Sequence, residues 1–233
     1  MNFKLFLFLF LSFILFTIIG TLTHECGHYV AGKLVGISST VHYNYTDLEE
    51  FPRYPEADEI YIKYKEQIEA KQDFPLKKRF ETLVKDSDEK YFYFTIGGPL
   101  QTIFTGTIGL LLMIFYRKSF FTTNTLNLRK WLLVFISLFW LRELANCVVM
   151  IALLLLTNKR SFNSDEVKIA QYFGWPFESV TIITAIMAFI IGLTVTFKFV
   201  PTAQRKTFIA AGFAGGIAGY ILWLYILGPI ILP

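Results

Sequence analysis

Cysteine and histidine are both scarce in this chain, whose 233 residues include two cysteines and three histidines. Cys26 and Cys147 lie in long apolar runs, so the sequence predicts neither a disulfide framework nor a cysteine-based zinc site. Charged residues make up only 17% of the chain, and the formal net charge is +4. A positive excess of this size is ordinary for a membrane protein with basic loop anchors, and nucleic-acid binding is not expected.

The N-terminal apolar run lacks the features of a cleaved signal peptide. No Ala-x-Ala-like cleavage site follows Phe16, and the residues before Cys26 are not the small ones that a lipoprotein signal needs. Cleavage would also separate the run from the polar residues at its far end. We therefore expect this run to remain in the protein as a membrane span.

Hydrophobic residues dominate the composition, at 54% of the chain, and the mean hydropathy is +0.49. A helix needs about 20 apolar residues to cross a bilayer. Runs of this length cover approximately residues 4–35, 91–116, 131–157, 179–200 and 207–231. The sequence thus predicts an all-α polytopic membrane protein with about five transmembrane helices. These helices form a single membrane domain, residues 1–233, with little chain left for a soluble core.

One polar insertion, residues 37–90, separates the first two runs and contains thirteen acidic and nine basic residues. Within it, residues 57–72 could form an exposed helix. Alternation over residues 40–46 favours a strand, whose edge could accept an extended substrate. His42 belongs to this strand and is either a polar loop residue or a contact of a metal site.

The first apolar run contains the segment His24-Glu25-Cys26-Gly27-His28, an HExxH pattern. Histidines four residues apart lie on one face of a helix, so two imidazoles can reach one metal ion while Glu25 leans toward the open coordination position. This is the layout of a zinc hydrolase site, with two ligands and a general base on one helix. Ionisable side chains at membrane depth are costly and usually functional, which favours a metal site here. Cys26 points to the other side of the helix and is expected to pack.

The third metal ligand has two candidates. Glu143 lies about 18 Å deep in the third span, where a lone carboxylate needs a partner, and Arg142 next to it faces another side of the helix. Glu143 is therefore a candidate ligand or an interhelical polar contact. Asp165 follows Ser164, a fitting N-cap, in a loop on the membrane side nearer to the HExxH segment. The local pattern favours helix capping for Asp165 over metal ligation.

Polar and helix-breaking residues in the second and third spans are candidates for substrate positioning. Gly97 and Gly98, followed by a proline, weaken the second span and let another backbone come close, either for catalysis or for helix packing. Gln101 could donate a hydrogen bond to a bound peptide, and Asn146 is a further polar residue in the third span. The small residues of 210–219 suit close packing between spans and do not define an oligomeric state.

The chain resembles the site-2-type intramembrane zinc metalloproteases, and in particular their compact bacterial subgroup. The resemblance is carried by residues 24–28, by Gly97-Gly98-Pro99-Leu100, by Asn146 in the third span, and by Asn163-Ser164-Asp165-Glu166 before a short helix and Gly174-Trp175-Pro176. It implies His24, His28 and Asp165 as Zn²⁺ ligands, Glu25 as general base, and a multi-pass protein of a bacterial cell membrane. The Leu-Asp-Gly sequence of better-known members is missing, which keeps Glu143 open as the alternative third ligand.

The expected activity is therefore zinc-dependent hydrolysis of peptide bonds in membrane-embedded or membrane-proximal substrates, within the lipid bilayer. Gln101 or Asn146 would position the substrate, and the break around Gly97 would help it to unwind. A metal transporter is one alternative, although it would repeat such ligands on several spans. A non-catalytic membrane adaptor with a structural metal is the other.

The membrane orientation is open. Basic residues in 117–130 and 198–206 favour a cytoplasmic N-terminus. The resemblance implies the reverse, because better-known members of the family carry their site nearer to the cytoplasmic face.

Overall fold

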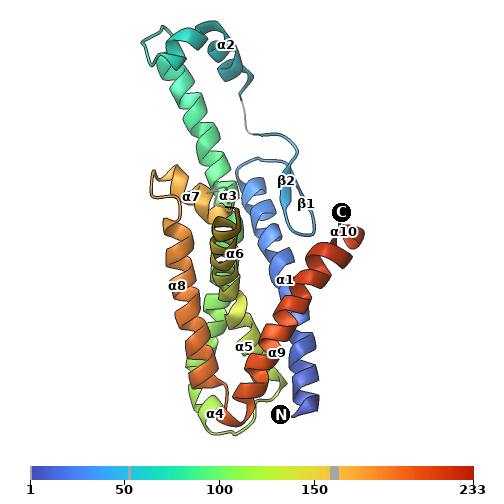
Figure 1. Ribbon diagram of the computed structural model, residues 1–233. Coiled ribbons are helices and arrows are strands. Elements are labelled where there is room, and N and C mark those ends of the chain that lie inside the picture. The colour runs from blue at the N-terminus through green and yellow to red at the C-terminus, as the bar shows by residue number, and fades with distance from the viewer. Residues whose placement is uncertain (1, 52–53, 158–162) are drawn as a thin grey trace.

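The computed structural model describes residues 2–51, 54–157 and 163–233. Five of its helical segments are long and apolar enough to cross a membrane, which confirms an all-α polytopic fold. These segments are Phe3–Leu34, Lys77–Phe115, Leu128–Thr157, Ser179–Phe199 and Thr202–Ile231. They lie side by side along one long bundle (Figure 1).

The secondary structure elements follow the chain in the order shown in Figure 1. They are α1 (Phe3–Leu34), β1 (Ser39–Val41), β2 (Thr46–Leu48), α2 (Pro55–Glu69), α3 (Lys77–Phe115), α4 (Arg117–Phe121), α5 (Leu128–Ser137), the 3₁₀ turn η1 (Leu138–Trp140), α6 (Leu141–Thr157), α7 (Asp165–Tyr172), α8 (Ser179–Thr194), the π-helical η2 (Val195–Phe199), α9 (Thr202–Ile221), the π-helical η3 (Leu222–Leu227) and α10 (Gly228–Ile231).

The second span differs most from the sequence-based expectation, because its helix begins at Lys77 and not near residue 91. Residues 77–90 are polar but contain no glycine or proline, so the apolar run ends there while the helix continues. Helix α2 folds back beside this extension, and Glu56 accepts hydrogen bonds from Arg79. The two helices form an arm that projects beyond the bundle (Figure 1). The exposed helix expected at residues 57–72 is confirmed as α2.

Helix α1 lies between α3 and α9, and small residues allow both contacts. A Cβ atom on Gly27 would lie 2.5 Å from the carbonyl oxygen of Gly97, so the two backbones touch where α1 meets α3. On the other side, a Cβ on Gly215 would lie 2.6 Å from the carbonyl oxygen of Phe10. The small-residue face of α9 therefore packs within the chain against α1.

The expected strand at residues 40–46 is a hairpin. Val41 pairs with Thr46, and the backbone N–H of His42 donates to the carbonyl of Tyr45 at 2.9 Å, which closes the turn. The hairpin is fixed to the end of the last span, since the Trp223 indole donates to the Tyr43 carbonyl at 2.8 Å. The His42 ring stacks on Tyr45 and contacts the Pro233 carbonyl, so it does not reach the predicted metal site.

Candidate metal centre

Two buried histidines on α1 begin the site. His24 and His28 are 1% and 5% exposed, and one helical turn separates them. Their Nε2 atoms lie 3.3 Å apart and point into the same space. Such a distance between two ring nitrogens leaves room for an ion that both of them coordinate.

Asp165, the first residue of α7, closes the group from the other side. Its Oδ2 atom lies 3.2 Å from His24 Nε2 and 3.1 Å from His28 Nε2. The capping role expected for Asp165 belongs to Ser164, whose hydroxyl accepts from the N–H of Val167, so the aspartate side chain is left to face the histidines. These three residues could hold a metal ion.

Electrostatics favour the charged form of the aspartate. Burial raises the pKa of Asp165, but the hydrogen bonds with His24 and His28 lower it further, and the pKa is held well below its usual range. Asp165 is therefore a carboxylate anion at neutral pH, which is the form that binds a cation.

Helix α3 fixes the orientation of both imidazoles. The Nδ1 atom of His24 lies 2.9 Å from Thr102 Oγ1, and the Nδ1 atom of His28 lies 2.9 Å from the carbonyl oxygen of Phe94. Partners at Nδ1 leave Nε2 free for a metal, and such outer contacts normally set the ring orientation of ligand histidines. Thr102 is not among the residues predicted from the sequence. The one feature of the sequence that could have indicated Thr102 is its spacing, since Phe94, Gly98 and Thr102 follow one another at intervals of four residues and share one face of α3.

Of the two glycines predicted to position substrate, only Gly98 lies directly against the metal group. A Cβ on Gly98 would lie 2.3 Å from His28 Nε2 and 2.5 Å from His24 Nε2. Gly97 faces the backbone of Gly27, which corresponds to the packing alternative. Gln101 is beside Gly27 as well. Its Nε2 donates to Thr105, and its Oε1 is buried without a hydrogen-bond partner among the residues the structure describes.

Glu25 is 2% exposed and has two polar neighbours from distant parts of the chain. The hydroxyl of Thr46, at the start of β2, lies 3.1 Å from its Oε2 and 2.9 Å from its carbonyl oxygen. The Arg142 guanidinium on α6 forms an ion pair with its Oε1 at 3.4 Å. Neither neighbour could be predicted from the sequence, because contacts between α1, the hairpin and α6 depend on how these elements dock.

Glu143, the alternative third ligand, lies elsewhere. It is fully buried near Glu166 and Thr184 and is not one of the three grouped residues, and neither of its carboxylate oxygens has a hydrogen-bond partner in the described part of the chain. Asn146, one turn later on α6, donates its side-chain N–H to Glu166 Oε1 at 3.0 Å. The Asn146 contact ties α6 to the residue that follows Asp165, whereas the interhelical contact of Glu143 stays a prediction.

Comparison of the chain with known protein families, with curated proteins and with solved structures found no match. The chemistry of the site is therefore inferred from its own residues.

Proposed function

We propose that this protein is an intramembrane zinc metalloprotease that hydrolyses peptide bonds of membrane-embedded or membrane-proximal substrates. The observation that carries the proposal is a triangle of two buried imidazole nitrogens and one oxygen of the half-buried Asp165, with Glu25 on the helix that carries both histidines. Three protein ligands and one open position are typical of catalytic zinc sites, whereas structural sites use four protein ligands.

The spacing of the three atoms supports zinc. A tetrahedral ion with bonds of about 2.0–2.1 Å keeps its ligand atoms about 3.3 Å apart. The triangle formed by His24, His28 and Asp165 has sides of 3.3, 3.2 and 3.1 Å. When bound, zinc would polarise a substrate carbonyl and lower the pKa of water at the open position.

Glu25 is the general base in this proposal. It would accept a proton from the attacking water and pass it to the leaving amine. Thr46 and Arg142 hold its carboxylate in place from two sides. The Nε–H of Arg142 is buried and has no partner in the described part of the chain, so one donor is left for the substrate oxygen that gains negative charge.

Gln101 remains the proposed substrate-positioning residue on α3. Because its Nε2 donates to Thr105, its unpartnered Oε1 is left as an acceptor, and in this proposal that oxygen would receive an N–H of an extended peptide, in place of the donor role expected from the sequence. Asn146 instead donates a hydrogen bond to Glu166, and in this proposal it helps to hold α7, the helix that carries Asp165. Helix α3 continues through Gly97, so the break expected there is not found, and unwinding of a helical substrate near this residue is only a proposal.

The two alternatives explain less of the geometry. A transporter passes its metal between successive sites, and residues 2–51, 54–157 and 163–233 contain one group of three ligands. An adaptor with a structural metal has no use for Glu25, which is buried beside the ligands and held by an arginine.

The substitution Glu25→Gln tests the proposal, because it keeps the size of the side chain and removes the base. Purified wild type in proteoliposomes, with a set of single-span peptides as probes, should cleave at least one of them. Loss of zinc to a chelator should stop cleavage, and added zinc should restore it.

We expect Glu25→Gln to bind as much zinc as wild type and to cleave at least about 100-fold more slowly. Cys26→Ser, at the exposed neighbouring position, is the matched control and should keep wild-type activity. Full activity of Glu25→Gln would refute the mechanism. Zinc binding without cleavage of any probe would favour the adaptor.

A further inference from the structure

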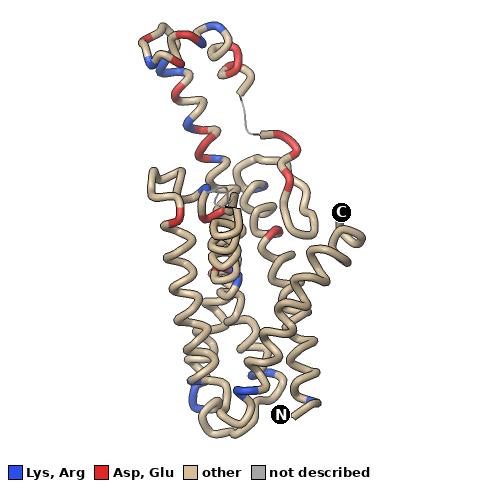
Figure 2. Tube along the Cα trace, viewed as in Figure 1, with Lys and Arg blue, Asp and Glu red and all other residues tan. Residues whose placement is uncertain are grey.

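The end of the bundle opposite the metal centre carries charge of one sign. Helices α1 and α9 begin there, and α3 ends there (Figure 1). Residues 2–8, 114–130 and 195–207, here called the basic end, contain no aspartate or glutamate. Their cationic residues are Lys4, Arg117, Lys118, Arg129, Lys130, Lys198, Arg205 and Lys206. Figure 2 shows blue and no red at this end, whereas both colours mix along the arm.

No carboxylate among the described residues pairs with these eight cations. Lys130 donates to the carbonyl of Ser119 at 2.6 Å, and Arg205 donates to backbone carbonyls near the end of η2. Lys118 and Lys206 are exposed. The positive charge of the basic end is therefore available to an external anionic partner.

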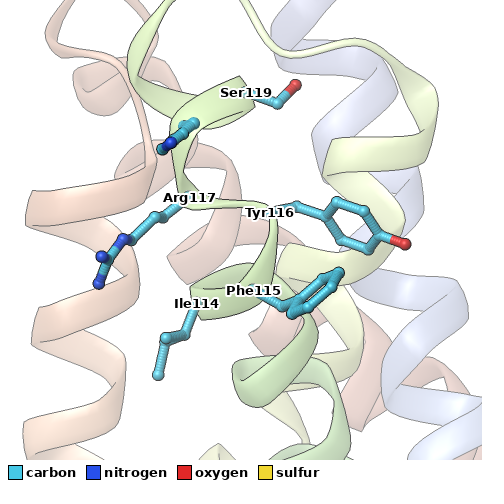
Figure 3. Close-up of a pocket in the computed structure, with 6 residues that line it drawn as sticks. Ile114, Phe115, Tyr116, Arg117 and Ser119 are labelled. Carbon is cyan, nitrogen blue, oxygen red and sulfur yellow. The ribbon is translucent and has the colours of Figure 1, made fainter.

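Apolar side chains lie among the cations. Phe115 and Leu128 are 78% and 70% exposed. Residues 114–119 line a hollow of about 470 Å³, in which Arg117 and Ile114 extend to one side and Phe115 and Tyr116 to the other (Figure 3). Exposed apolar groups beside cations match a lipid surface, which offers acyl chains next to phosphates.

We propose that the basic end binds the anionic phospholipid headgroups of the cytoplasmic leaflet, so that the metal centre lies toward the non-cytoplasmic face. Cytoplasmic leaflets are negatively charged and attract juxtamembrane lysine and arginine, and short loops rich in these residues stay on the cytoplasmic side. His24 lies twenty residues after Lys4 on α1, which places the site about 30 Å from the basic end. This inference does not depend on proteolysis.

Cysteine labelling in intact bacterial cells tests the orientation. Both native cysteines are first replaced by serine, and a single cysteine is then introduced as Gln72→Cys or Asn124→Cys. Gln72 lies between α2 and α3, Asn124 lies in the basic end, and both positions are exposed. A membrane-impermeant maleimide should label Gln72→Cys in intact cells and Asn124→Cys only after permeabilisation. The opposite pattern, or equal labelling of both in intact cells, would overturn the proposal.

Lipid binding tests the partner. Detergent-solubilised protein is titrated with dioctanoyl phosphatidylglycerol and, separately, with dioctanoyl phosphatidylcholine and inorganic phosphate. Wild type should prefer phosphatidylglycerol, and Lys118→Gln and Lys206→Gln should each weaken this binding about fivefold. Lys63→Gln and Lys78→Gln on the arm are matched controls and should have no effect. Equal affinity for the two lipids, equal loss in the controls, or equally tight phosphate binding would contradict a lipid partner.

Discussion

The substitution Gly98→Ala should remove the metal without removing any ligand. A methyl group at this position would lie 2.3 Å from His28 Nε2 and 2.5 Å from His24 Nε2. Ordinary contacts of a Cβ atom begin near 3.4 Å, so the closer nitrogen would have to move by about 1.1 Å. A bond of about 2.0–2.1 Å between zinc and nitrogen cannot absorb such a displacement.

The histidines cannot withdraw freely, because Thr102 and the carbonyl of Phe94 hold their Nδ1 atoms at 2.9 Å. Loss of one outer contact of a ligand histidine typically reduces metal affinity about 10–100-fold. Gly98→Ala displaces the ligand atoms themselves, so we expect a loss of at least about 100-fold.

Competition between the purified protein and a chromogenic chelator measures this affinity, and circular dichroism checks that the helices persist. Gly216→Ala is the matched control, since the added carbon would meet no atom within 4 Å in the described structure apart from its own stretch of helix. If Gly98→Ala bound zinc within threefold of wild type at unchanged thermal stability, the two Nε2 atoms could not be the ligand atoms.

Three further substitutions separate the metal, the α7 contact and the helix packing. Thr102→Val removes the hydroxyl beside His24 at nearly constant shape, so zinc affinity in the same competition should fall about 10–100-fold, and an unchanged value would contradict the orienting role. Asn146→Ala leaves Glu166 Oε1 without its donor and should lower stability by about 1–3 kcal/mol in chemical denaturation, whereas wild-type stability would show that this contact is dispensable. Gly215→Leu forces a side chain into a carbonyl of α1 at 2.6 Å and should destabilise by about 1–3 kcal/mol, while the same change at Gly216 should not; equal effects would refute the α1–α9 contact.

The parts of the fold that depend on local pattern could be predicted from the sequence. Apolar runs define the five spans, and the four-residue spacing of His24 and His28 is enough to place both rings on one side of α1. Helix α3 begins fourteen residues before the predicted apolar run, because polarity marks the end of an apolar run and not the end of a helix.

The parts that depend on docking could not be predicted in this way. Asp165 lies 137 residues beyond His28, and only the family resemblance pointed to it over Glu143. The partners of Glu25 are further cases. Arg142 and Glu143 are adjacent, and the rotation of α6 about its own axis decides which of them meets α1. The spacing of apolar residues along α6 does not determine that rotation.

Helix α3 joins the arm to the metal centre. It begins in the arm at Lys77, continues without interruption to Phe115, and provides the Phe94 carbonyl and the Thr102 hydroxyl that hold the two histidines. About 25 Å of helix separates Lys77 from Phe94. A molecule that binds the arm would thus be connected, through one continuous helix, to the residues that orient the two imidazoles.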